Sequence, residues 1–385
     1  MTFGTLAVVV LAALLGPLLA LLPRWRVPVV VGELAAGVLL GPTLAGYLQP
    51  GDPTFAFLAE TGFALVMFVA GSHVPIRDAR LVHGLRTGAA RAVVVGALAV
   101  PPAFALAGLF HTGHTAMYAV LIASSSAALV LPMVDSLKLG GPALLDLLPQ
   151  VAIADTVCIV AVPLAVDPAH AARAALGALA VMGGAAVLFL LLRHIEKSGL
   201  RHRVHQVSER RKFALELRFS LAALFGLAAL AAATHVSVML AGFSLGLAVA
   251  AVGEPRRLAK QLFAVTEGFF APLFFVWLGA ELNLRQLGHR PEFILLGLAL
   301  GAAAIAVHAL MRVSGQPISL GVLAASQLGV PVAAATLGTQ AGVLEPGEAA
   351  AMMLGALVTV SAAALAGGFA PRDPTVGEAK PESPS

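Results

Sequence analysis

The chain has 385 residues, of which 59% are hydrophobic and only 11% are charged, with a formal net charge of +4. About a quarter of the residues in soluble domains are charged, so this composition excludes an ordinary soluble fold. Apolar runs close to the roughly 20 residues that a bilayer-spanning helix needs follow one another from Gly4 to Gly368. They are too long for barrel strands, and we predict an all-α polytopic membrane protein.

The first apolar run, residues 4–22, follows no basic segment, which indicates a retained span rather than a cleaved signal peptide. Gly, Pro and charged residues separate the later runs. The next six spans are predicted at 28–47, 54–73, 89–110, 114–134, 142–166 and 170–193. The last six are predicted at 213–233, 236–253, 265–284, 292–313, 317–340 and 346–368. The expected total is therefore about thirteen transmembrane helices.

Basic residues gather in the loops on one side of these spans. With the N-terminus outside, all Lys and Arg residues except Arg173, Arg285 and Arg290 fall on the inner side. Cytoplasmic loops carry this excess, so we predict a multi-pass protein of the cell inner (plasma) membrane with the C-terminus in the cytoplasm. Because the positive charge follows the topology, it does not indicate a nucleic-acid partner.

A basic loop from Arg193 to Lys212 divides the chain into six spans, one connecting span and six further spans. An odd number of crossings before the second six makes the halves enter the membrane from opposite faces, as in inverted repeats of secondary transporters. The predicted parts are a transmembrane domain over 1–368, with a first repeat at 1–166, a linker span and loop at 170–212 and a second repeat at 213–368. Residues 369–385 are predicted to form a disordered cytoplasmic tail.

The fifth and twelfth spans correspond to each other in these repeats, and both contain residues that interrupt a helix. Those residues are Ser124, Ser125, Ser126 and Pro132 in the fifth span, and Gln327, Gly329, Pro331 and Thr336 in the twelfth. Paired broken helices expose backbone carbonyls and amides near the membrane centre and indicate an ion or substrate site. The alternative is that the small residues only let helices pack closely.

Asp155 stands near the middle of the sixth span, with no Lys or Arg within a turn or two. A carboxylate at that depth is costly and usually has a function. Its protonation should respond to hydration and to a bound cation, so one carboxylate can exchange a proton for a cation. The alternative is a packing role through a hydrogen bond between helices. Thr156 either offers a hydroxyl ligand or bonds back to its own helix.

Other polar residues of the spans are weaker candidates. Glu33 and Glu267 lie near predicted span ends, where snorkelling or an interfacial ion pair is the expected role. Glu281 lies nearer the outer membrane interface, where we expect a structural role, with lining of an entry funnel as the alternative. His308 is expected to be a packing histidine, with a proton relay as the alternative. The sequence has no phosphate-binding loop, potassium-filter motif or Arg-repeated voltage sensor, so we expect no cofactor and no enzyme activity, but coupling to an ion gradient.

Several stretches resemble the Kef-like and NapA-like branch of monovalent cation:proton antiporters. VPVVVGELAAGVLLGPTLAG (27–46) looks like the second-span signature of that branch, and LAETGFALVMFVAGSHV (58–74) is similar to the span after it. The remaining similar stretches are those at 122–132, 152–164, 216–250 and 271–284. The likeness covers nearly the whole membrane domain, and the order and spacing of its parts make it specific.

The resemblance implies alternating access, with a core bundle moving against a scaffold and crossed broken helices holding the ion. Asp155 matches the aspartate that binds cation and proton in the family. Members usually place Asn, Asp or Gln before that residue, where this chain has Ala154, and many carry a buried Lys where this chain has Ala303. The missing second carboxylate favours one-for-one exchange. The family also implies a homodimer. Kef systems end in a nucleotide-binding regulatory domain that this sequence lacks, so a separate regulatory subunit remains an alternative.

We therefore predict a secondary antiporter that exchanges K⁺ or Na⁺ for H⁺ at Asp155. Oxygen ligands suit such hard cations. The supporting ligands are predicted to be Ser124, Ser125, Ser126 and Thr156, with Thr336, Gln327, His308 and Glu281 as secondary candidates. Two alternatives remain, namely a symporter of another solute with the same fold and a membrane subunit or sensor that does not transport.

Overall fold

The computed structural model describes residues 1–21, 29–72, 79–137, 139–166, 171–198, 214–234, 236–253, 256–281, 285, 287 and 290–370. Within these ranges the protein is helical and contains no β-strand. Ten of the described helices are long and apolar enough to cross a membrane, and two shorter apolar helices accompany them. The centre of the predicted basic loop and the predicted tail from 371 onward lie outside the described residues.

The first half begins with two short helices in place of the single predicted span. The helices of this half are α1 (Phe3–Ala13), α2 (Leu15–Ala20), α3 (Val29–Leu40), α4 (Pro53–Ser72), α5 (Ala79–Leu109), α6 (Thr115–Ala123), α7 (Ala127–Ser136) and α8 (Pro142–Val166). The connecting helix is α9 (Ala171–Lys197). Helix α5 begins ten residues before the predicted span at 89, because its first turns contain Ala, Arg and Leu, which favour a helix without being apolar throughout.

The second half has the same number of helical spans. Its helices are α11 (Leu215–Ala233), α12 (Val238–Val252), α13 (Arg256–Val265), the π-helical turn η2 (Thr266–Phe270), α14 (Ala271–Glu281), α15 (Glu292–Ala309), the 3-10 turn η4 (Leu310–Ser314), α16 (Ile318–Ala324), α17 (Gly329–Gln340) and α18 (Glu348–Gly367). The tenth span starts earlier than predicted, since the amphipathic α13 continues through η2 into α14. Each of the thirteen predicted spans thus falls on a helix or on consecutive helices of the described chain.

Helix α4 shows how the sequence starts one of these spans. Pro53 occupies the first helical position, and the Asp52 carboxylate caps the helix by accepting hydrogen bonds from the Thr54 and Phe55 N–H groups at 2.9 and 3.0 Å. The ammonium group of Met1 also pairs with Asp52. Hydrogen bonds from this ammonium and from the Phe55 N–H lower the pKa of Asp52 below its usual range. The cap therefore keeps its charge at neutral pH.

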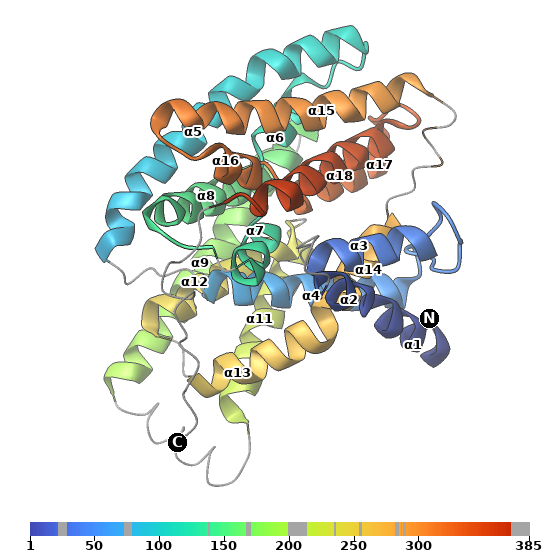
Figure 1. Cartoon of the computed structure of the whole chain (residues 1–385). Helices are drawn as coiled ribbons and strands as arrows, with labels where there is room; N and C mark the ends of the chain where they lie inside the picture. The colour runs from blue at the N-terminus through green and yellow to red at the C-terminus, as the bar shows by residue number, and fades with distance from the viewer. Residues whose placement is uncertain are drawn as a thin grey trace, which may run out of the picture.

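The helices form two bundles (Figure 1). The core bundle contains α5 to α8 and α15 to α18, and the scaffold bundle contains α1 to α4 and α11 to α14. Helix α9 contacts α8 of the core bundle and both α11 and α12 of the scaffold bundle. The core bundle meets the scaffold mainly through α7, which packs on α3 and α4, and through α18, which packs on α3.

The same packing scheme occurs twice. Helix α5 packs on α8 as α15 packs on α18, and α3 packs on α14 as α12 packs on α4. A chain built from two repeats of one fold would pair its helices in this way. The recurrence agrees with the predicted inverted repeat, whose sequence boundaries remain a prediction.

Close glycine contacts hold the two main pairs of the scaffold bundle. A Cβ atom on Gly37 would lie 2.7 Å from the Cα of Gly279, and one on Gly246 would lie 2.8 Å from the Cα of Gly71. Real Cβ atoms do not approach backbone that closely, so these helices touch only because the residues are glycine. Small residues at such crossings let membrane helices pack backbone to backbone.

Gly279→Ala is expected to lower the thermal stability of the protein, because its new methyl group would overlap the Leu34 carbonyl oxygen. Overpacking typically costs about 1–3 kcal/mol. The matched control is Gly226→Ala on α11, where the added Cβ would meet none of the described residues within 4 Å and Ala should be neutral or slightly stabilising. Thermal unfolding of the purified proteins, followed by size-exclusion chromatography after heating, measures the difference. Equal melting temperatures for the two variants would contradict the packing argument.

Candidate functional site

The first interrupted helix breaks at residues 124–126. Helix α6 ends at Ala123 because Ser124 has an extended backbone, with φ −74° and ψ 153°. The Ser124 hydroxyl donates to the Leu121 carbonyl oxygen at 2.9 Å, and the Ser124 N–H donates to the same oxygen at 3.0 Å. Ser124, Ser125 and Ser126 are all buried, so the break places three polar side chains inside the bundle.

The second interrupted helix, α16 and α17, breaks at residues 325–328. Ser326 donates to the Leu323 carbonyl oxygen at 2.8 Å, just as Ser124 does to Leu121 in the first break. Ser326 and Gln327 are buried. The pair of discontinuous helices predicted from the sequence is therefore present, with the same local hydrogen bond at both breaks.

Asp155 lies on α8, which packs against all four half-helices α6, α7, α16 and α17. The side chain is only 3% exposed, and its Oδ2 accepts a hydrogen bond from the Ala127 N–H at 2.8 Å. Ala127 is the first residue of α7, so the carboxylate faces the partly positive N-terminal end of a half-helix. Its other oxygen, Oδ1, is buried and meets no donor among the described residues.

Thr359 on α18 makes a comparable contact in the second half. Its Oγ1 accepts a hydrogen bond from the Gln327 N–H at 3.2 Å, at the break before α17. Asp155 Oδ2 likewise accepts a hydrogen bond from the Ala127 N–H, where α7 begins after the first break. Sequence reasoning missed Thr359, although superposing the thirteenth span on the sixth could have drawn attention to it. A neutral hydroxyl thus accepts a backbone N–H at the second break, and a carboxylate does so at the first.

Thr359→Val is expected to destabilise the protein, because it leaves the Gln327 N–H at a buried break without its acceptor. Leaving such a donor unpaired costs about 1–3 kcal/mol. Thr359→Ser keeps the hydroxyl and is the matched control. The melting temperature of each purified variant gives the comparison, and a valine variant as stable as the serine variant would show that the hydrogen bond contributes little.

The predicted supporting ligands divide into two groups. Ser125 Oγ and Gln327 Nε2 are buried and have no partner among the described residues, so both remain free to contact a substrate. The Thr156 hydroxyl instead donates to the Ala152 carbonyl oxygen at 2.8 Å, which is the second of the two roles that the sequence left open. Ser124 likewise bonds back to its own helix.

The secondary candidates lie apart from Asp155. Thr336 is exposed on α17, and Glu281 ends α14 in the scaffold bundle. His308 is buried on α15, and its Nδ1 donates to the Ala304 carbonyl oxygen at 2.9 Å. Among the described residues, none of these three makes a hydrogen bond or ion pair to Asp155. They are therefore not gathered into one site with the carboxylate.

No charged partner compensates Asp155 in the described part of the chain. Its neighbour Ala154 is buried and adds no second carboxylate. Ala303, where the family's lysine was expected, is an apolar residue of α15. No ion pair of the described residues includes Asp155, so its charge is balanced only by the Ala127 N–H and the half-helix behind it.

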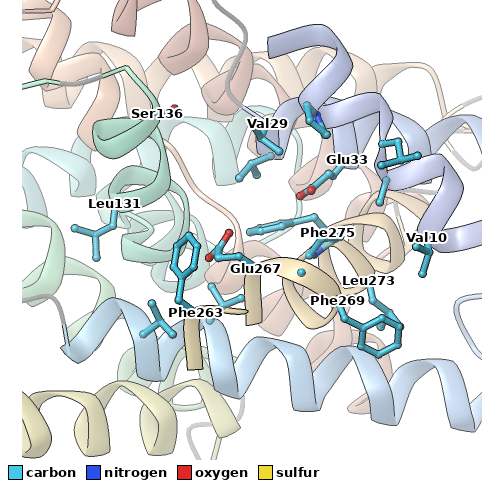
Figure 2. A pocket seen from close by; sticks show the side chains of 18 of the residues that line it. Val10, Val29, Glu33, Leu131, Ser136, Phe263, Glu267, Phe269, Leu273 and Phe275 are labelled. Atoms are coloured by element: carbon cyan, nitrogen blue, oxygen red, sulfur yellow. The ribbon is translucent and has the colours of Figure 1, made fainter. Parts of the chain in front are cut away.

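A separate cavity of about 560 Å³ lies between α1, α2, α3, α4, α7 and the segment from α13 to α14. We name it the Glu33 cavity after its buried carboxylate. Glu267 also lines it, and Figure 2 shows both carboxylates directed into it, with the Phe275 ring between them in that view. Asp155 is not among its lining residues; α7 packs on α8 as well as on α3 and α4 and so stands beside both sites.

Two bundles and two interrupted helices, with a buried carboxylate beside the breaks, give this membrane protein the sodium/proton antiporter fold. The chain belongs to the sodium/hydrogen exchanger family, whose transmembrane-domain profile matches residues 10–368.

Named relatives agree with this assignment. YjbQ of Bacillus subtilis, which is named for Na⁺/H⁺ antiport, is 24% identical over 380 residues, or 92% of this chain and 61% of YjbQ. The chain thus spans about three fifths of that relative. A Methanocaldococcus jannaschii protein named Na⁺/H⁺ antiporter 3 is 25% identical over 77% of this chain and 75% of its own length.

The solved structures extend the likeness to the fold. The sodium proton antiporter MjNhaP1 of Methanocaldococcus jannaschii at pH 8 matches with a TM-score of 0.63 and 17% identity, covering 94% of this chain and 96% of that one. A second structure of MjNhaP1, from electron microscopy, has a TM-score of 0.66 over 99% and 100% of the two chains. At this identity the match establishes a common architecture.

Proposed function

We propose that this protein exchanges a monovalent cation, Na⁺ or K⁺, for H⁺ across the membrane, with Asp155 as the shared binding site. The observation that carries the proposal is the state of the two carboxylate oxygens. Oδ2 is held by the Ala127 N–H at 2.8 Å, and Oδ1 is buried and accepts no hydrogen bond from the described residues. A buried carboxylate oxygen in that state favours a proton or a cation as its partner.

Competition for this single oxygen couples the two ions. A proton on Asp155 neutralises the carboxylate and removes the charge that attracts a cation, while a bound cation displaces the proton. The described chain offers Asp155 no ion pair and no adjacent second carboxylate. One cation would therefore replace one proton, which is the basis for proposing one-for-one, electroneutral exchange.

Oxygen atoms around the breaks are proposed to complete the cation's coordination. Ser125 Oγ is buried and has no hydrogen-bond partner in the described part of the chain, two residues before the Ala127 N–H that binds Asp155. The breaks also leave backbone carbonyl groups outside regular helix. Carbonyl and hydroxyl oxygens bind hard cations such as Na⁺ and K⁺. Ser124 and Thr156 are weaker ligands in this proposal, since both hydroxyls donate to carbonyl groups of their own helices.

The two-bundle architecture supports alternating access as the mechanism. All four half-helices and α8 belong to the core bundle, whereas the glycine contacts that tie α3 to α14 and α4 to α12 belong to the scaffold bundle. We propose that the core bundle carries Asp155 past a fixed scaffold. We further propose a homodimer in the inner membrane, with the N-terminus outside.

A proteoliposome assay tests the proposal directly. Purified protein is reconstituted with a pH-sensitive dye, and Na⁺, K⁺ or Li⁺ is added outside at several pH values. A cation-dependent pH change that is insensitive to membrane potential is the expected result. Absence of any such change with every cation would overturn the proposal, and a response to potential would overturn electroneutrality.

A further inference from the structure

The Glu33 cavity is separate from the proposed transport site and has a distinctive lining. Glu33 is 5% exposed, and no hydrogen bond or ion pair reaches it from the described residues. Its carboxylate points into the cavity, towards Glu267 of the π-helical turn (Figure 2). Both carboxylates line the same cavity. Glu33 therefore does not take the snorkelling or ion-pair role expected from its sequence position.

Aromatic rings flank these carboxylates. Phe275 lies between Glu33 and Glu267 in Figure 2, and Phe263 lies on the far side of Glu267. Most of the remaining lining consists of aliphatic side chains from α1, α2, α3 and α4. Aromatic faces and carboxylates attract the same kind of group, a positively charged one, and the rings favour cations that shed water easily.

The volume also limits the ligand. A cavity of about 560 Å³ falls within the range of about 300–1,000 Å³ typical of small-molecule sites and is far larger than a bare Na⁺ or K⁺ needs. An inorganic ion would leave the apolar walls without a partner. An organic ammonium with an apolar substituent would place charge on Glu33 and carbon on the aliphatic and aromatic walls.

We propose that the Glu33 cavity binds an amphipathic organic cation, a quaternary or protonated amine bearing one apolar group. The ammonium contacts Glu33 and the face of Phe275, and the apolar group lies among the aliphatic side chains of α1 and α2. The site is built from the scaffold bundle with Leu131 and Ser136 of α7, so binding does not require the transport site at Asp155.

Calorimetric titration of the purified protein with benzyltrimethylammonium tests this proposal. This probe keeps its charge at every pH. Glu33→Gln is expected to weaken binding by at least about tenfold, as loss of one charge-assisted contact would. The matched control is Glu60→Gln on α4, an exposed carboxylate outside the cavity, which should bind as wild type does. Tetramethylammonium, which has the charge without the ring, should bind more weakly, and benzenesulfonate should not bind.

Further variants keep the outcome decisive. Phe263 is 57% exposed, so Phe263→Ala should fold normally and still lose several-fold in affinity, which covers the case in which Glu33→Gln does not fold. Asp155→Asn should bind the probe normally, whether or not the protein exchanges cations. Undiminished binding by both cavity variants, loss of binding in Asp155→Asn alone, or no binding by wild type would each overturn the proposal.

Discussion

Asp155→Asn is expected to reduce cation:proton exchange in proteoliposomes to the level of vesicles without protein. Asparagine has nearly the same shape and still accepts the Ala127 N–H through its amide oxygen, so the break before α7 should persist. It does not take up a proton and has no charge for a cation. Loss of a charged partner worth about 3 kcal/mol weakens cation binding roughly a hundredfold.

Two controls separate this effect from misfolding. The melting temperature of Asp155→Asn should equal or exceed that of wild type, because a buried charge has been removed. Asp155→Glu keeps the charge but moves it by one methylene, and should retain part of the activity with altered cation preference. Exchange by Asp155→Asn at the wild-type rate would remove Asp155 from the mechanism and leave the family assignment untouched.

Arg91→Met is expected to destabilise the core bundle strongly. Arg91 is 6% exposed on α5 and joins that helix to the second half of the chain. Its Nε donates to the Ser314 hydroxyl at 2.9 Å, its Nη2 donates to the Ser314 carbonyl oxygen at 3.0 Å, and its Nη1 lies 3.5 Å from Asp146 Oδ2. Losing these charge-assisted bonds should cost about 2–4 kcal/mol.

Thermal unfolding of purified Arg91→Met, followed by size-exclusion chromatography, measures the loss. The matched control is Arg86→Met, an exposed position on the same helix, where a change within about 0.5 kcal/mol is expected. Lysine carries the charge but lacks the forked geometry that reaches both Ser314 atoms and Asp146, so Arg91→Lys should recover only part of the stability. Equal melting of Arg91→Met and Arg86→Met would show that the contact to Ser314 is not stabilising.

The fold was largely predictable because the membrane imposes a simple code on the sequence. Each spanning helix must be apolar over a known length, so hydropathy located the thirteen spans. The orientation inferred from the basic loops stays a prediction. Helix boundaries were less predictable at α5 and α13, since a helix continues into water wherever its residues favour helix. The broken spans were predictable because Ser and Gly clusters occur at equivalent places in the two halves.

The site was only partly predictable. Asp155 could be identified because an isolated carboxylate in an apolar span is costly wherever it points. Thr336 was a candidate ligand only because it is a polar residue of the interrupted twelfth span, and it lies exposed on α17. Glu33 was assigned to an interface, but it is buried and faces Glu267 across a cavity. Hydropathy indicates how deep in the membrane a residue lies. Whether its side chain is exposed, as in Thr336, or faces a cavity, as in Glu33, depends on the side of the helix that it occupies and on what packs there.

By itself, the sequence determined that this chain is a helical membrane protein of two related halves with one isolated carboxylate, Asp155, at the centre of a span. Only the tertiary structure decided that the Ala127 N–H holds one oxygen of that carboxylate, that Thr359 repeats the contact, and that Glu33 and Glu267 share a cavity. The reason is physical: hydropathy and charge act along one segment, whereas hydrogen bonds and cavities require segments distant in the chain to meet.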